Sequence, residues 1–248
     1  MEINSLTCIG CGECRHFCIM GCIDFERGGA KNKVYCKVDD RECVDCGICL
    51  RSDVCPTDSL SQPVHGWPRS IRGTFSNPLA EHKETKVPGR GTEEIKTNDI
   101  TNRYKLGFVG IAAEMGRPGI GARMSEVQKV FRALAKLNVE FETSNPLCSL
   151  LSNMKTGDMN PEVLDEKVLS CIIEMIIPES LLIPVLDTFD KAAEELDTLL
   201  TIGLISKTNE KLEVPIAQIL EKEGRWFSFN VKTNLGLGKL TVKGGVKA

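Results

Sequence analysis

Ten of the twelve cysteines fall before residue 56, and eight of them form two closely spaced groups. The first group has spacings of two, two and three residues and consists of Cys8, Cys11, Cys14 and Cys18. The second group has spacings of two, two and five residues and consists of Cys43, Cys46, Cys49 and Cys55. Such dense grouping favours metal ligation in a reducing compartment over a disulfide framework, which would spread cysteines through a small secreted chain.

The residues between these cysteines suit a metal cluster. Gly10, Gly12 and Gly47 permit tight turns, so the three closely spaced thiolates of each group can converge while the backbone approaches them. CxxC pairs also bind zinc, but a zinc site takes four ligands, usually as two pairs. Two triplets, each with a more distant fourth cysteine, favour iron–sulfur chemistry.

These eight cysteines make the first sixty or so residues resemble bacterial two-cluster ferredoxins. The resemblance implies two [4Fe–4S] clusters, with the fourth cysteine of each group ligating the other cluster. One ligand set is then Cys8, Cys11, Cys14 and Cys55, and the other is Cys43, Cys46, Cys49 and Cys18. The chain departs from the family at Ile19, where a proline is usual, and by two additional residues before Cys55. That insertion leaves open a [3Fe–4S] form or an unusual potential for one cluster.

The remaining cysteines have no ligand spacing of their own. Cys22 and Cys36 are interpreted as small buried residues in preference to ligands. Cys148 and Cys171 lie far downstream without a CxxC partner, so we expect them in an ordinary core.

The length of the chain bears on the number of domains, and its net charge bears on the kind of partner. At 248 residues the chain is too long for one ferredoxin module, and a second domain is expected. The net charge of -3 offers no general attraction to nucleic acid or anionic membranes, so protein or small-molecule partners are favoured. No stretch approaches the roughly 18 apolar residues of a membrane span, and the start, MEINSLTCIGCG, lacks the pattern of a signal peptide. We therefore expect no membrane span and a cytoplasmic location.

The rest of the chain predicts an α+β protein with four segments: a ferredoxin domain at 1–62, an ordered connector at 63–103, a second domain at 104–208 and an extension at 209–248. The connector is rich in Pro, Gly and charge, yet its large apolar side chains indicate that it lies against a domain or a partner. Those side chains are Trp67, Ile71, Phe75 and Leu79.

In the second domain, apolar patterns predict strands at 104–114, 139–142, 168–177 and 199–205. Ser125, with Gln128 as a capping box, and Ser180 are predicted to cap the two intervening helices. The resulting order, βαββαβ, is that of a ferredoxin-like sandwich, a fold that does not itself indicate a function. A further helix and an edge strand are expected after Glu210.

Two glycine-rich segments could bind a ligand. GRPGIGAR, at 116–123, precedes a predicted helix, and Arg117, Gly119, Gly121 and Arg123 could hold a phosphate or carboxylate at its N-terminus. The alternative is a sharp turn that simply requires glycine. GRGTEEIKTND, at 89–99, is either a solvated loop or a docking or cofactor-contacting segment.

The segments VPGRGTEEIKTNDIT and VGIAAEMGRPGIGAR, after a ferredoxin-type cysteine run, resemble the N-terminal part of 6-hydroxynicotinate reductase-like proteins of anaerobes. That resemblance implies a ferredoxin-fed reduction of an N-heteroaromatic carboxylate, with a flavin as an additional centre. Three functions follow. The leading prediction is an electron-transfer subunit that passes low-potential single electrons to the flavin or metal centre of a partner oxidoreductase. The alternatives are a reductase in its own right and a redox or small-molecule regulatory module.

Overall fold

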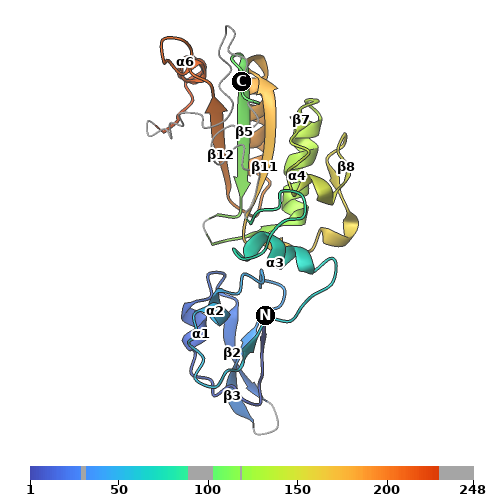
Figure 1. Cartoon of the computed structure of the whole chain (residues 1–248), viewed down its shortest axis with the longest axis vertical. Helices are drawn as coiled ribbons and strands as arrows, with labels where there is room; N and C mark the ends of the chain where they lie inside the picture. Colours follow the sequence, from blue (N-terminus) through green and yellow to red (C-terminus); the bar gives the residue numbers. More distant parts are fainter. Residues whose placement is uncertain (29–31, 89–102, 118, 229–248) are drawn as a thin grey trace, which may run out of the picture.

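The computed structural model describes residues 1–28, 32–88, 103–117 and 119–228. It is an α+β protein, and every strand pair within these residues is antiparallel. The cysteine-rich part and the larger sheet lie at opposite ends of the molecule, with α3 (Ser70–Ser76) between them (Figure 1). Within the described ranges, no helix is both long and apolar enough to cross a membrane.

The cysteine-rich part is built from short elements. Strands β1 (Glu2–Ile3) and β4 (Leu60–Ser61) pair with each other, as do β2 (Ile23–Gly28) and β3 (Lys33–Val38). The one-turn helices α1 (Glu13–His16) and α2 (Ile48–Arg51) each follow a left-handed glycine, Gly12 or Gly47. Because each helix carries the third cysteine of its group, these two turns orient Cys14 and Cys49.

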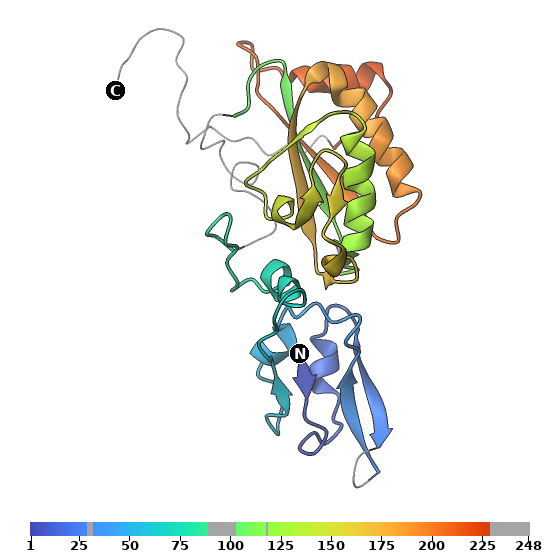
Figure 2. The same ribbon diagram turned by 90° about the vertical axis from the view of Figure 1, so that its right-hand side faces the viewer.

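The larger part contains a four-stranded sheet in the order β12-β5-β11-β7. Along the chain, β5 (Phe108–Met115) is followed by α4 (Met124–Ala135), β7 (Glu140–Phe141), β11 (Cys171–Pro178), α5 (Leu182–Ala193) and β12 (Leu200–Ser206). This is the predicted alternation of strands and helices. Helices α4 and α5 lie side by side over one face of the sheet (Figure 2).

Side chains along β5 alternate between the two faces of the sheet, and this alternation explains which of them form the larger core. Val109, Ile111, Ala113 and Met115 point to the helix-covered face and are buried, and α4 buries a matching helical stripe against them. Phe131 of this stripe meets Phe141 of β7 edge to face, with ring centroids 4.9 Å apart. Cys148 and Cys171 belong to this core, as expected.

Small elements fill the connections. Strand β6 (Ala122–Arg123) pairs with β10 (Lys167–Val168), and β8 (Leu151–Asn153) pairs with β9 (Asp158–Met159). Short 3-10 turns occur at Cys148–Leu150, Pro161–Val163 and Glu179–Leu181. Helix α6 (Pro215–Lys222) follows β12. The edge strand expected further along lies outside the described residues.

Both helix caps were predicted wrongly. Helix α4 begins at Met124, before Ser125, and the Gln128 side chain instead accepts the backbone N–H of Met159 at 2.9 Å. Ser180 lies inside a 3-10 turn, and α5 begins at Leu182 without a side-chain cap. At α4 the backbone N–H groups of Met124 and Ser125 donate to the carbonyl oxygens of Glu166 and Leu164, which are distant in sequence and which a local capping motif does not detect.

Two predicted strands have different bounds. The strand expected at 104–114 begins at Phe108, because Tyr104 turns back and packs against Gly110. The strand expected at 168–177 divides into β10 and β11, which belong to different sheets. In the connector, Ile71 and Phe75 are buried in the larger core, whereas Leu79 is exposed.

Candidate metal centres

Two hollows in the cysteine-rich part bring the predicted ligand sets together. Hollow A has four of these cysteines in its wall: Cys8, Cys11, Cys14 and Cys55. Hollow B has the other four: Cys18, Cys43, Cys46 and Cys49. Their empty volumes, about 300 Å³ and 320 Å³ with open solvent included, are nearly equal. The fourth cysteine of each group thus lies with the first three of the other group, although ligation itself stays a prediction.

Glycines allow the loops to approach these hollows. Gly10 has φ +69°, and a Cβ there would lie 2.7 Å from the carbonyl oxygen of Val34 in β3. Gly12 has φ +83°, and a Cβ would lie 2.8 Å from the Phe25 ring. At both positions the backbone conformation and the available space require glycine.

Backbone N–H groups point at three of the sulfurs. Cys22 N–H donates to Cys18 Sγ at 3.3 Å, and Ser59 N–H donates to Cys55 Sγ at 3.2 Å. In both bonds the donor lies four residues after the last cysteine of its group, so the two groups share the same local N–H···S hydrogen bond. Cys36 N–H also donates to Cys8 Sγ, at 3.4 Å. Such N–H···S bonds stabilise negative charge on sulfur.

Two cysteines that sequence reasoning treated as packing residues also line the hollows. Cys36 is in the wall of hollow A and Cys22 in that of hollow B, and both are buried, as expected. Cys22 Sγ lies 3.4 Å from Cys18 Sγ, and hydrogen bonding with the Cys22 thiol lowers the pKa of Cys18 to about 6. The sequence signal for Cys22 is its spacing of four from Cys18, which repeats between Cys55 and Ser59.

The core of the cysteine-rich part consists mainly of cysteine. Its cluster of buried side chains has eight members, six of them cysteines, and the other two are Met1 and Ile23. All twelve cysteines are free thiols, so no disulfide reinforces this small core. A core with so few fully buried apolar side chains would gain stability from a bound metal group. The donor set and the core therefore both fit thiolate-ligated clusters.

Among the described residues, no group of three or more His, Cys, Asp or Glu side chains is arranged to hold a metal ion. The cysteines of each hollow line its wall.

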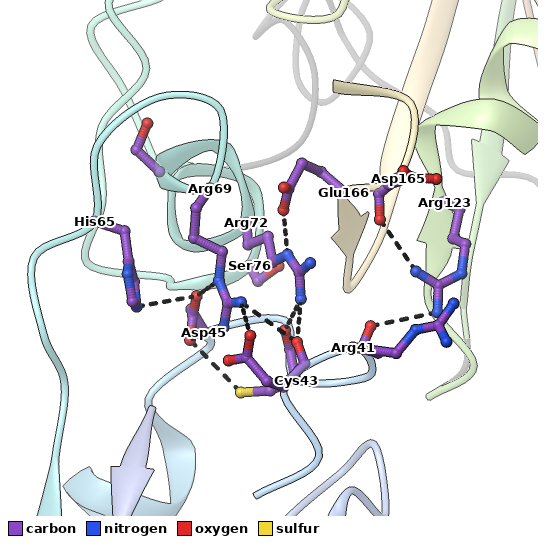
Figure 3. A network of polar contacts seen from close by, with 12 residues as sticks. Arg41, Cys43, Asp45, His65, Arg69, Arg72, Ser76, Arg123, Asp165 and Glu166 are labelled. Carbon is purple, nitrogen blue, oxygen red and sulfur yellow. Dashed lines mark hydrogen bonds and ion pairs between the residues drawn. The ribbon is translucent and has the colours of Figure 1, made fainter. Parts of the chain in front are cut away.

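A buried carboxylate lies beside hollow B. The side chain of Asp45, with 3% exposure, binds the N-terminal ammonium of Met1 at 2.5 Å. It also binds the Arg69 Nε at 2.8 Å (Figure 3). Burial alone would raise the pKa of Asp45, but Arg69 and the ammonium outweigh it and lower the pKa to about 2. Asp45 also accepts a contact from the Cys43 thiol at 3.5 Å, so this network adjoins a predicted ligand.

Arg72 of α3 joins hollow B to the larger part of the chain. One guanidinium nitrogen donates to the carbonyl oxygens of Asp40, at 2.7 Å, and Cys43, at 2.8 Å. The Nε donates to the carboxylate of Glu166, which lies just before β10 (Figure 3). Sequence reasoning missed this contact because the two residues lie 94 positions apart.

Arg123, one of the predicted anion-binding residues, lies at the same junction. Arg123 donates to the Glu42 carboxylate and to the backbone carbonyls of Arg41 and Asp165. Glu42 also binds Lys167 Nζ at 2.5 Å, and this contact is the main reason that its pKa is lowered. Arg117 pairs with Glu114 at 3.3 Å.

The glycines of this loop approach the cysteine-rich part. A Cβ on Gly121 would lie 2.9 Å from the Met20 side chain, and one on Gly119 would lie 3.5 Å from the Ile19 carbonyl oxygen. The structure thus brings Gly119, Gly121 and Arg123 to a junction inside the chain. Anion binding there stays a prediction. The second candidate segment, at 89–99, lies outside the described residues.

No family model, curated protein or solved structure matches this chain.

Proposed function

We propose that this chain is an iron–sulfur electron-transfer protein that holds two [4Fe–4S] clusters, one in each hollow. The observation that carries the proposal is the crossed grouping of eight cysteines around hollows A and B. Zinc sites formed from neighbouring CxxC pairs would not require this crossing. Bound there, each cluster would take up and release single electrons.

The protein's own groups hold and shield the clusters in this proposal. The cysteine thiolates of each set come from both cysteine groups, so each cluster would link the segment around α1 to the segment around α2. The N–H groups of Cys22, Cys36 and Ser59 stabilise negative charge on three of the sulfurs. Buried Met1 and Ile23 line hollow B and help to exclude water from it.

We further propose that residues 1–62 form a bacterial ferredoxin domain and that 104–208 form a ferredoxin-like sandwich. The connector at 63–103 and the extension at 209–248 complete this division. Support for the sandwich comes from the order of β5, α4, β7, β11, α5 and β12 and from the antiparallel sheet order β12-β5-β11-β7. The small, separate cysteine core supports a distinct first domain.

The electron acceptor is proposed to be the flavin or metal centre of a partner oxidoreductase in anaerobic, cytoplasmic metabolism. Cys11 in the wall of hollow A is exposed, whereas the other three cysteines of that set are buried or half-buried. Electrons could therefore cross to a partner from hollow A over a short distance. The low potential expected of bacterial ferredoxin clusters suits such a donor.

Anaerobic purification with iron, sulfide, zinc and flavin quantified on the same sample tests this function. We expect about eight iron atoms per chain, from two clusters of four, and no flavin. Electron paramagnetic resonance after reduction with dithionite should show two interacting clusters. Zinc in place of iron, or iron for one cluster only, would refute the two-cluster assignment.

The same sample separates the alternatives. A chain that retains flavin and reduces an N-heteroaromatic carboxylate alone would be a reductase of the 6-hydroxynicotinate type. Clusters that respond to a small molecule without passing electrons to a partner would favour a regulatory module.

A further inference from the structure

Arg72 is a buried cation beside hollow B. Its side chain has 6% exposure, and its guanidinium is always charged in proteins. It donates to the carbonyl oxygen of Cys43, a proposed ligand, at 2.8 Å, and to that of Asp40 at 2.7 Å. The charge is therefore fixed against the loop that leads into the cluster.

The carboxylate that pairs with Arg72 comes from the larger part of the chain. Glu166 has 9% exposure and binds Arg72 Nε from the segment just before β10. Asp45, the other buried carboxylate at hollow B, is already paired with the Met1 ammonium and Arg69. The net field of Arg72 at hollow B thus depends on how closely Glu166 approaches.

Hollow A has a different environment. The cation that contacts a ligand carbonyl there is Lys33, whose Nζ donates to Cys8 O at 2.9 Å. Lys33 is half-buried, Cys11 is exposed and Glu13 lines the hollow. Solvent therefore screens the charge of half-buried Lys33 more strongly than that of buried Arg72.

Resting on the proposed function, we propose that Arg72 raises the reduction potential of the cluster in hollow B and that Glu166 opposes it. Reduction adds one electron from a donor to the cluster and so increases its negative charge, which a nearby buried cation stabilises. A carboxylate on the far side of that cation weakens this effect. The larger part of the chain would then set the potential of the cluster that it contacts.

Redox titration of the complete, cluster-loaded protein tests this role, with dithionite as reductant and paramagnetic resonance as the readout. The signals are first assigned with Cys11→Ser, which disrupts the cluster in hollow A, and Cys46→Ser, which disrupts that in hollow B. In Arg72→Gln, at a fixed potential, we expect the ratio of reduced to oxidised cluster in hollow B (cluster B) to fall about tenfold. For a one-electron couple this is a shift of about 59 mV. Glu166→Gln should shift cluster B in the opposite direction.

The cluster in hollow A (cluster A) is the internal reference. Its reduction potential should be the same in Arg72→Gln and Glu166→Gln as in the unaltered protein. Arg72→Lys preserves the charge and should restore most of the lost potential, even if the packing differs. Should Arg72→Gln fail to retain its clusters, Glu166→Gln and Arg72→Lys still decide the question. The inference is refuted if Glu166→Gln leaves the reduction potential of cluster B unchanged or lowers it. It is also refuted if the potentials of both clusters shift by the same amount. Absence of two clusters in the unaltered protein would instead refute the proposed function.

Discussion

Replacing Gly10 with alanine tests whether the first cysteine loop must lie against β3 for hollow A to form. Gly10 has φ +69°, a conformation that costs an alanine about 1–2 kcal/mol. The new Cβ would also lie 2.7 Å from Val34 O and 3.1 Å from Val34 C, which are backbone atoms. Neither can move without displacing β3, so overpacking adds about 1–3 kcal/mol.

Gly21→Ala is the matched control. Gly21 has φ +61°, but nothing lies within 4 Å of a Cβ built there. The two variants therefore share the backbone strain and differ in the contact with β3. The difference in unfolding free energy between them should be about 1–3 kcal/mol, with Gly10→Ala the less stable.

Anaerobic urea unfolding and iron analysis measure both effects. We expect Gly21→Ala to retain about eight iron atoms and Gly10→Ala to lose those of the cluster in hollow A first. Equal stability and equal iron content in the two variants would show that the close approach of Gly10 to Val34 is unimportant for hollow A.

Three further predictions concern ligands and cores. Cys11→Ser and Cys46→Ser should each lose or impair one cluster, whereas Cys148→Ser should keep the full iron content; equal iron loss in all three would contradict the ligand sets. Burial raises the pKa of Cys148 to about 12, so at pH 7 only about one side chain in 100,000 is thiolate, against about one in 100 at its ordinary value of 9.0. Iodoacetamide should therefore label it in urea but not in the native protein, and rapid native labelling would argue against this burial. Phe131→Ala should lower the unfolding free energy by about 3–5 kcal/mol, measured by urea denaturation, because Phe131 is fully buried against Phe141; a loss below about 1 kcal/mol would contradict the described packing.

Cluster removal should affect the two parts of the chain differently. Chelation of the iron under denaturant-free conditions should unfold the cysteine-rich part, since six of its eight buried core residues are cysteines. The larger sheet has an extensive apolar core and should remain folded. Hydrogen exchange measured before and after iron removal checks this, and unchanged protection of β2 and β3 would show that the cysteine core needs no metal.

The sequence by itself determined features that depend on neighbours in the chain. Cysteines separated by two intervening residues lie close together on one turn of the backbone, so the two cysteine triplets could be identified from the sequence alone. Apolar periodicity likewise identified β5, α4, α5 and β12, because a buried face repeats every two residues in a strand and about every 3.6 in a helix. The crossed grouping of Cys18 and Cys55 followed from a family resemblance and not from spacing.

Only the tertiary structure decided contacts between distant residues. Periodicity gave no indication that Cys36 lines hollow A, that Gln128 binds the backbone of Met159, or that Arg72 pairs with Glu166. Nor did any local pattern indicate that Arg123, which was predicted to bind an anion, pairs with Glu42 of the cysteine-rich part. The physical reason is that side-chain partners across the fold depend on which surfaces pack together, and no local pattern of residues records that packing.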